Sequence, residues 1–367
     1  MKLSKYTYVI QKEILDNMEC AQLFLLSFVS NNMKKFIKSS QMKRFESIRS
    51  IEYRCHHISN PPFVNITFED SFESIMDFLN IIKKRNKKKK RRNDIFQLNV
   101  SGKMIEFQMC KYNHVPKVCD YDRDKESVTE SIHNYFLDIF GSSTNCIWRV
   151  NKIEEDFITF VPKLNNVSFC VDLRLDEEFT EMAILETFFF SFPILKSVRL
   201  EAALTTELFN PESKFYQAES ICVNQFQHTF PNVLRHFQGR QAIVNCTQWG
   251  ASEDLIEFVN RWKSGEAFQK LEYLYFKSWD GEILENQILN EIEAKYIDST
   301  KQPPTHSVPK IYDWHRVHAE PNTDPIISHT YVVRATDNHV ASILIQERTI
   351  SFGVWNKTEE EFLRLMD

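Results

Sequence analysis

The sequence predicts a mixed fold, α/β or α+β, with a helical module at the N-terminus. Three short apolar segments with helical spacing occupy residues 8–38. Beyond residue 45, strand-like runs alternate with segments whose apolar residues recur at i, i+3 and i+4, which favours helices packed on a sheet. Hydrophobic residues make up 43% of the 367 residues, which is enough core for two or three domains.

The first helices expose more apolar surface than they can bury among themselves. Residues 8–18 carry one apolar face, and residues 19–29 are apolar on nearly every face, so the second helix should be covered on all sides. A third helix is predicted after Ser30, a suitable cap, with Met33 and Phe36 on its apolar face. Thirty residues in three short helices form too small a core, so a second chain or the rest of this one must cover the remainder.

The N-terminal residues resemble the F-box, a helical module that docks a substrate receptor onto the Skp adaptor of a cullin-based ubiquitin ligase. The sequence is similar to the nematode branch of that family at four short segments: Asn17-Met18-Glu19, Leu26-Ser27, Val29-Ser30 and Lys35-Phe36-Ile37-Lys38. The resemblance places the module at residues 5–42 and implies an adaptor contact through apolar anchors. These anchors are Ile10, Ile14, Leu15, Leu23, Leu26, Val29 and Phe36.

One departure from the family pattern lies before the first helix. Where the family usually has Leu-Pro, this chain has Tyr6-Thr7. Proline would preset φ at the start of the helix, so its absence removes that preorganisation and predicts weaker adaptor binding. Two alternatives therefore stay open: a helical subdomain packed only on its own body, and an interaction scaffold with a degenerate F-box.

The region 45–178 carries no recognisable motif but shows a clear alternation of elements. Strands are predicted at 50–54, 64–68, 95–100, 104–109, 146–150, 157–161 and 167–173. Helices are predicted over Phe72 to Ile82, over Val128 to Ile139, and over Met182 to Phe192 just beyond this region.

The region 180–356 shows a shorter and more regular alternation. Strand centres near Val198, Ile221, Ile243 and Leu274 lie 23, 22 and 31 residues apart. Helical segments are predicted between them at 212–218, 232–237 and 252–262. Two of the spacings match leucine-rich repeats, so we predict an irregular, leucine-rich-repeat-like parallel sheet. A non-repetitive α/β domain is the alternative.

Three segments of the same region resemble the type 2 F-box-associated region that follows nematode F-boxes. They read FPNVLRHFQGRQAIVNCTQW, LIEFVNRWKSGEAFQKLEYLYFKSW and, after Arg334 and Asp337, ISFGVWN. The last of them is similar to the closing β segment of those proteins. The resemblance implies a non-catalytic substrate receptor whose partners are the Skp adaptor, a cullin bound through it, and a protein target. The sequence names neither the target nor the residues that bind it.

A single low-complexity run interrupts the region 45–178. Nine positive charges fall within ten residues, on Lys83, Lys84, Arg85, Lys87, Lys88, Lys89, Lys90, Arg91 and Arg92. Such charges repel one another and stay solvated. The run is therefore a solvated loop, a nuclear localisation signal or a phosphate-binding patch. No aromatic residue interleaves with it, so base stacking is not supported and a nuclear nucleic-acid-associated protein is only an alternative reading.

Other classes of function find no support in the sequence. No G-x-S-x-G, G-x-x-x-x-G-K-[ST], H-E-x-x-H or G-x-G-x-x-G motif occurs, so we expect no enzyme and no cofactor. Cys110, His114 and Cys119 with residues 55–57 supply zinc-type ligands, but their spacing is not that of a zinc knuckle, so no metal is expected. No stretch approaches the roughly 20 apolar residues of a membrane span. The eight cysteines resemble buried thiols, which fits the cytoplasm or nucleus.

Overall fold

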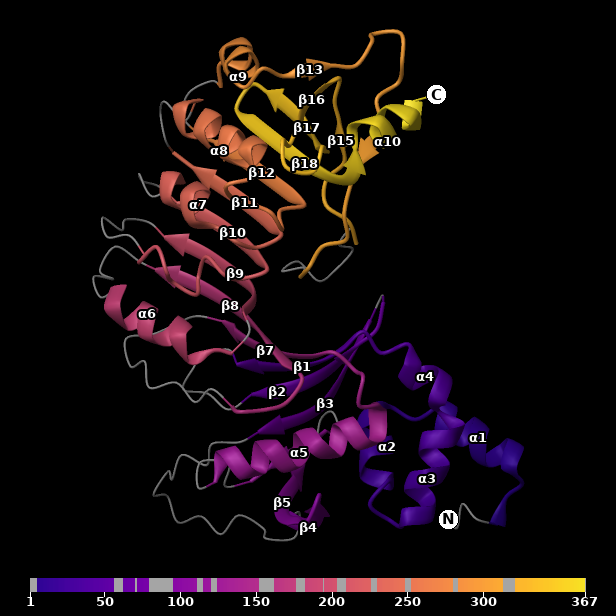
Figure 1. The fold of residues 1–367 in the computed structure, drawn as a ribbon. Helices are drawn as coiled ribbons and strands as arrows, with labels where there is room; N and C mark the ends of the chain where they lie inside the picture. Colours follow the sequence, from indigo (N-terminus) through magenta and orange to yellow (C-terminus); the bar gives the residue numbers. More distant parts are fainter. Residues whose placement is uncertain are drawn as a thin grey trace. The chain divides into compact units, whose positions relative to one another are not determined.

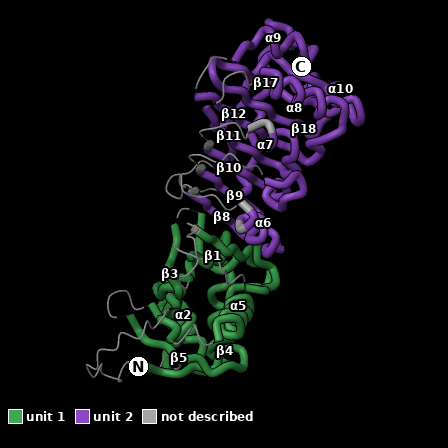
Figure 2. Tube along the Cα trace, turned by 90° about the vertical axis from the view of Figure 1, so that its left-hand side faces the viewer, with its two compact units in different colours: residues 1–168 green, residues 169–367 purple. Residues whose placement is uncertain are grey.

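The computed structural model divides the chain into two compact units, Met1–Ser168 and Phe169–Asp367 (Figure 2). It describes residues 5–55, 62–69, 71–78, 95–110, 115–119, 124–151, 162–175, 182–193, 195–202, 209–225, 230–247, 252–279, 283–312 and 321–366. The predicted mixed class with an N-terminal helical region is confirmed (Figure 1). Among the described residues, no helix is long and apolar enough to cross a bilayer.

Four short helices begin unit 1: α1 (Tyr8–Asp16), α2 (Cys20–Leu26), α3 (Asn31–Ser40) and α4 (Met42–Glu46). The predicted cap of α3 is confirmed, because the Ser30 side chain accepts a hydrogen bond from the Met33 N–H at 3.1 Å. Helix α2 begins at a capping box between Glu19 and Gln22. Both devices satisfy N–H groups that have no partner within the helix.

A sheet and one long helix complete unit 1. The strands are β1 (Ser50–Cys55), β2 (Phe63–Thr67), β3 (Phe72–Phe78), β4 (Ile95–Val100), β5 (Lys103–Met109), β6 (Pro116–Val118) and β7 (Cys146–Asn151). Their order in the sheet is β7-β1-β2-β3-β6-β5-β4. Helix α5 (Lys125–Phe140) runs between β6 and β7 in the chain and contacts β4, β5 and α3.

The helix predicted over Phe72 to Ile82 is wrong over residues 72–78, which form strand β3, and its last four residues lie outside the described residues. The pairing of β2 with β3 shifts register between Val64 and Asn65, which is a β-bulge. Consequently the consecutive residues Ile75 and Met76 are both buried. Ile75 and Met76 follow Phe72 at i+3 and i+4, the spacing of a helix, which is why periodicity predicts a helix where the chain forms a bulged strand.

Unit 2 contains the regular alternation. Its first part consists of β8 (Val167–Leu175), α6 (Met182–Ser191), β9 (Leu195–Ala202), β10 (Ser220–Gln225), α7 (Phe230–His236), β11 (Gln241–Cys246), α8 (Ser252–Ser264) and β12 (Tyr273–Ser278). Strands β8 to β12 are parallel and adjacent in chain order. Helices α6, α7 and α8 lie along one side of them (Figure 1). The predicted parallel strands are confirmed, whereas their leucine-rich-repeat character stays a prediction.

The core of this parallel sheet follows from the register. Val198, Ile221, Ala242 and Leu274 are register partners on neighbouring strands, and all four are buried. The helix predicted at 212–218 is wrong: successive turns occur there, in which the N–H of Tyr216 bonds to the Ser213 carbonyl.

The C-terminal part of unit 2 is antiparallel. It contains α9 (Glu285–Glu291), β13 (Lys295–Tyr296), β14 (Thr305–His306), β15 (Ile326–Ile327), β16 (Thr330–Val333), β17 (His339–Gln346), β18 (Thr349–Thr358), α10 (Glu359–Leu363) and a 3₁₀ turn, Arg364–Met366. Strand β18 pairs with β12 and continues the sheet through β17, β16 and β13. The predicted closing β segment is therefore present.

Arg334 and Asp337 stabilise the turn between β16 and β17. The buried Arg334 guanidinium donates to both carboxylate oxygens of Asp337, at 2.9 and 2.6 Å. The guanidinium also lies over the ring of the buried Trp262, 5.1 Å from its centroid, which is a cation–π contact. Asp337 thus balances a charge that packs against the core of α8.

Replacing Asp337 with alanine should destabilise unit 2, because it leaves the buried Arg334 cation without its carboxylate. Loss of a charged hydrogen-bond partner costs about 1–3 kcal/mol. Thermal unfolding of the full chain measures the effect, with Glu291→Ala as the control, since Glu291 is exposed at the end of α9. An equal change in the two variants would contradict this role for Asp337.

Candidate adaptor-binding site

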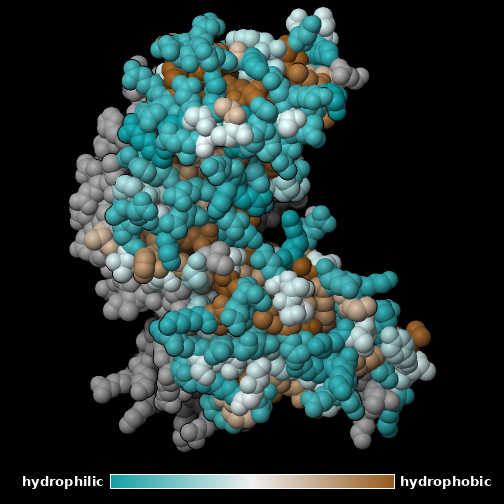
Figure 3. Space-filling view, in the orientation of Figure 1, coloured by the Kyte–Doolittle hydropathy of each residue, from teal (hydrophilic) through white to brown (hydrophobic). Residues whose placement is uncertain are grey.

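Apolar side chains are exposed on α1 and just before α3. Val9 and Ile10 are 74% and 46% exposed, and Val29 is 70% exposed. Tyr8 contacts Phe36 edge to face, with ring centroids 5.8 Å apart, which joins α1 to α3. Figure 3 shows apolar atoms on the surface over α1, at the right-hand end of unit 1. We call the exposed Tyr8, Val9, Ile10 and Val29, with the half-buried Phe36, the α1–α3 surface. Exposed apolar groups mark interaction sites.

The seven residues predicted to contact an adaptor differ in accessibility. Ile10 and Val29 are exposed, and Ile14, Leu26 and Phe36 are half-buried. Leu15 and Leu23 are fully buried. The two buried leucines hold the helices in the interior of unit 1 and offer a partner no surface. Tyr8 and Val9 are not among the predicted contact residues, although both belong to the apolar stretch 8–18.

Helix α2 is attached to α5 by a cluster of aromatic rings. Phe24 packs edge to face on Phe28, Tyr135 and Phe136, with centroids 5.0 to 5.7 Å apart. Phe28 stacks on Tyr135 at 4.3 Å. The hydroxyl groups of Tyr135 and Ser27 lie 2.9 Å apart, and burial raises the pKa of Tyr135. The aromatic cluster fixes the apolar back of α2 on a helix about 110 residues further along the chain.

The Glu73 carboxylate of β3 attaches α2 and α4 to the sheet. One oxygen accepts the Cys20 N–H at the start of α2, at 2.7 Å, and the other accepts Arg44 Nη2 of α4, at 2.8 Å. Arg44 also donates to the Met18 carbonyl, at 2.7 Å. Burial opposes ionisation of Glu73, but the Cys20 N–H and the Arg44 guanidinium outweigh it and lower the pKa of this carboxyl.

A carboxylate on α5 anchors α3. Asp138 forms ion pairs with Lys34 and, at 2.8 Å, with Lys38. Burial alone would raise the pKa of Asp138, but the two ammonium groups have the larger effect, so the pKa is lowered. Lys34 also lies over the Tyr135 ring, 4.0 Å from its centroid. Helices α2 and α3 therefore share α5 as their support.

The start of α1 has the backbone geometry that proline would impose. Thr7 is the N-cap residue, with φ −64° and ψ 156° and no hydrogen bond from its side chain. Proline fixes φ near −65°. The chain thus reaches without proline the conformation that the Leu-Pro pattern presets, although Thr7 must lose conformational entropy to adopt it.

Comparison with protein families matches this helical region to one domain. The model of the F-box domain matches residues 8–45. These residues are an F-box domain. No curated protein and no solved structure matches the chain. F-box domains bind the Skp adaptor and through it a cullin, and F-box proteins are generally non-catalytic substrate receptors.

The other predicted sites lie outside the described residues or are not assembled there. The basic run 83–92 falls in residues 79–94, which are not described. The same holds for residues 56 and 57 and for His114, so the zinc-type ligands cannot be placed together. In the described ranges, no three His, Cys, Asp or Glu side chains gather as a metal site. The eight cysteines are free; Cys110 and Cys222 are half-buried and the others are buried.

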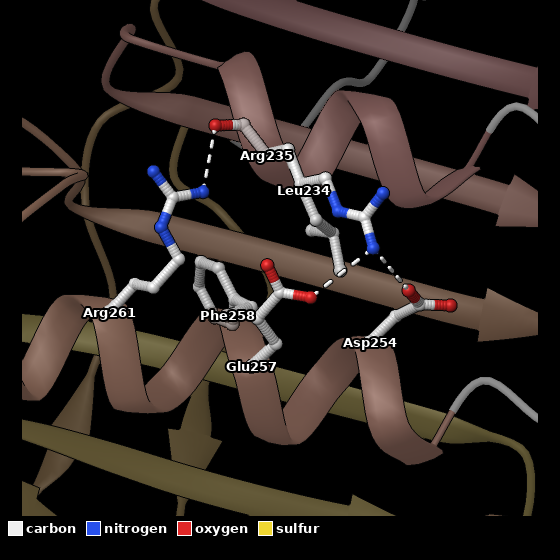
Figure 4. Close-up of a pocket in the computed structure, with 6 residues that line it drawn as sticks. All are labelled: Leu234, Arg235, Asp254, Glu257, Phe258 and Arg261. Atoms are coloured by element: carbon white, nitrogen blue, oxygen red, sulfur yellow. Dashed lines mark hydrogen bonds and ion pairs between the residues drawn. The ribbon is translucent and has the colours of Figure 1, made fainter.

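Far from the F-box domain in sequence, a hollow lies between α7 and α8 of unit 2. It is lined by Leu234, Arg235, Asp254, Glu257, Phe258 and Arg261 (Figure 4). Arg235 pairs with Glu257 and Asp254, at 3.3 and 3.7 Å, and Arg261 donates to the Arg235 carbonyl at 3.0 Å. Because the charged groups satisfy one another, the hollow is a seam between two helices and carries no ligand-binding hypothesis.

Glu73→Gln should loosen the attachment of the F-box domain, because it removes the charge that pairs with Arg44. We expect a loss of about 1–3 kcal/mol in unfolding free energy at neutral pH. Since folding lowers the pKa of Glu73, its contribution is present above the unfolded value of about 4.3 and disappears as pH falls through the folded value. Urea unfolding between neutral pH and pH 3 measures it. Glu69→Gln, at an exposed carboxylate, is the control, and identical pH profiles for both variants would refute the role of Glu73.

Thr7→Pro should stabilise the start of α1, because Thr7 already has a φ compatible with proline. The expected gain is about 0.4–1 kcal/mol, from reduced entropy of the unfolded chain. Hydrogen exchange of the first amides of α1 measures it, with Thr7→Ala as the control, since the Thr7 side chain makes no capping hydrogen bond and alanine does not fix φ. Faster exchange in Thr7→Pro than in the parent chain would show that this φ alone does not make the position suitable.

Proposed function

We propose that this chain is the substrate-recognition subunit of a Skp, cullin and F-box ubiquitin ligase. The F-box domain binds the Skp adaptor, and the body of the chain binds a protein target. The observation that carries the proposal is an F-box domain whose buried side packs on the body while the α1–α3 surface stays exposed. The receptor performs no chemistry; it raises the effective concentration of the target beside a ubiquitin-charged enzyme.

The adaptor contact that we propose uses the α1–α3 surface together with the half-buried Ile14 and Leu26. Exposed apolar and aromatic side chains that become buried at an interface dominate its binding free energy. Leu15 and Leu23 act indirectly, since each is fully buried in unit 1 and holds a helix in position. The difference in burial thus distinguishes the residues proposed to bind the adaptor from those that hold the binding surface in shape.

Rigid attachment of the F-box domain supports the receptor role. The aromatic cluster, Glu73 and Asp138 join α2, α3 and α4 to the rest of unit 1. A target bound to unit 1 would therefore keep a fixed position relative to the adaptor. Fixed geometry increases the rate of transfer between two bound groups, because the orientation is already set.

We further propose that residues 180–356 are a type 2 F-box-associated region of the nematode kind. The three segments that resemble it include α7 with β11, α8 with β12, and β18. Within unit 2, α7 packs on α8 and β12 pairs with β18. Their contact supports the view that they form one module. A leucine-rich-repeat-like character, a location in the cytoplasm or nucleus, and a nuclear localisation role for the run 83–92 stay proposals from the sequence.

Charges placed on the α1–α3 surface should abolish adaptor binding. The triple variant Val9→Asp, Ile10→Asp, Val29→Asp buries unpaired carboxylates at the proposed interface, so we expect at least about a hundredfold loss of affinity for a Skp-family adaptor. Pull-down and calorimetry with purified adaptor measure it.

Phe190→Asp is the matched control for that variant, because Phe190 of α6 is 76% exposed and lies in unit 2. It should bind the adaptor like the parent chain. Circular dichroism checks that both variants keep their fold. If the parent chain binds no Skp-family protein, the ligase function is wrong and a scaffold with a degenerate F-box becomes the better hypothesis.

A further inference from the structure

We propose that the outer edge of β4 is the docking site for the target, and that the target presents an extended acidic segment that adds a strand to this edge. The inference rests on the proposed function and deepens it by naming the surface and the chemistry of the target. It concerns unit 1 alone, the unit that also contains the F-box domain.

Among the described residues, no strand pairs with the outer edge of β4, so its main-chain groups are available to a partner. Strand β4 is the last strand of the unit 1 sheet, and among the described residues it pairs only with β5. Ser101 and Gly102, with φ 49° and 90°, form a two-residue hairpin turn. In such a hairpin the flanking pair Val100 and Lys103 is hydrogen-bonded. The main-chain N–H and C=O groups of every second residue of β4, beginning with Asn99, therefore point away from β5.

The outward residues of β4 are Ile95, Gln97 and Asn99. A contact on the far side of β5 supports this assignment: Glu106, the register partner of Gln97, uses its carbonyl to accept the Cys119 N–H at 2.8 Å. Glu106 therefore directs its main-chain groups away from β4, and Gln97 directs its own away from β5. Three N–H and three C=O groups at this edge can pair with an added strand.

Within residues 95–100, the edge lacks the features that normally prevent strand addition. Natural edge strands are protected by charged residues, proline, bulges or short length. Strand β4 reads IFQLNV over six residues, with no charge and no proline, and its pairing with β5 shows no register shift. It is therefore suited to β-augmentation, in which main-chain hydrogen bonds give affinity and alternate side chains give specificity.

The two sides of β4 specify an alternating partner. Phe96 and Leu98 are half-buried and lie on the side of Phe107, whose ring stacks on Phe96 at 5.9 Å. On the other side, the Gln97 amide donates to Glu106 Oε1 at 2.9 Å. A strand with apolar residues at every second position would cover Phe96 and Leu98, while its polar residues would lie beside Gln97.

Charge in the adjoining sequence favours an acidic partner over a second copy of this chain. The run of nine positive charges ends at Arg92, three residues before Ile95, and three residues span at most about 11 Å. The run itself is not part of the proposed site. Its charge attracts an acidic segment and accelerates association, whereas two copies paired through β4 would bring two such runs together.

Helix α5 connects this edge to the adaptor-binding site. It contacts β4 and β5 and carries Tyr135 and Asp138, which hold α2 and α3. A target strand on β4 and an adaptor on the F-box domain would thus share one helix as support. This arrangement suits a receptor, because the target keeps a fixed position relative to the adaptor.

Two labelled peptides of equal composition test the proposal on the full chain by fluorescence anisotropy. One alternates valine and glutamate over about eight residues, the length of a strand; the other groups the valines and the glutamates in two blocks. We expect the alternating peptide to bind at least about tenfold more tightly, because only this one can place valines over Phe96 and Leu98 while pairing its backbone.

Gln97→Pro should remove that preference and Gln97→Ala should keep it. Proline deletes the outward N–H and obstructs pairing, but it leaves the β4–β5 hydrogen bonds intact because the Gln97 N–H points away from β5. Should Gln97→Pro prove unfolded, N-methylation of alternate residues of the alternating peptide, measured on the parent chain, tests the same hydrogen bonds.

Several outcomes would overturn the docking site. The first is equal affinity of the parent chain for the two peptides, and the second is equal affinity of Gln97→Pro and Gln97→Ala for the alternating peptide. The third is unchanged affinity after N-methylation of that peptide. The fourth is a dimer of the parent chain that Gln97→Pro dissociates, because a second copy would then be the occupant. Adaptor binding by the parent chain is measured in parallel. If it is retained while the peptide preference is absent, only the docking site is wrong; if it is absent, the proposed function is wrong.

Discussion

The contact between α2 and α5 is the interaction on which the candidate site depends. Phe24 of α2, and Phe28 just beyond its end, pack against Tyr135 and Phe136 of α5. One side of the F-box helices is therefore covered by unit 1 and the other is exposed. Burial of this aromatic area stabilises the arrangement by several kcal/mol, on the scale of about 25 cal/mol per Å² of apolar surface. Without it, the apolar residues of α2 would compete with those of α1 for any partner, and no single binding surface would be defined.

The sequence predicted the elements that have one strong local signal. Ser30 before an apolar period predicted the start of α3, and the evenly spaced apolar runs predicted β9 to β12 as parallel neighbours. Periodicity failed at β3, because the bulge there buries the adjacent residues Ile75 and Met76. It also failed at 212–218, where successive turns replace the predicted helix.

The candidate site was only partly predictable, because periodicity shows that a residue is apolar but not what covers it. Leu15 and Leu23 seemed equivalent to Ile10 and Val29 in sequence, yet the first two are buried by unit 1 and the others are exposed. The groups that attach this region to the rest of unit 1 are distant in sequence: Glu73 bonds to Cys20 across 53 residues and Tyr135 bonds to Ser27 across 108. Long-range partners of this kind leave no signal in the local pattern. The position of β4 as the last strand of unit 1 among the described residues likewise follows from the order of the sheet rather than from its composition.

Because α5 supports the F-box helices, the end of the F-box domain in sequence is not the end of the folded unit that contains it. The F-box domain ends at residue 45 as a sequence family, but the body that gives it shape extends to Ser168. Recombination or truncation at residue 45 would transfer a recognisable motif without the carboxylates of Glu73 and Asp138 or the ring of Tyr135. The folded unit that supports the F-box helices is therefore the whole of unit 1, and a fragment cut at residue 45 would lose the α5 and β3 contacts that hold these helices in place.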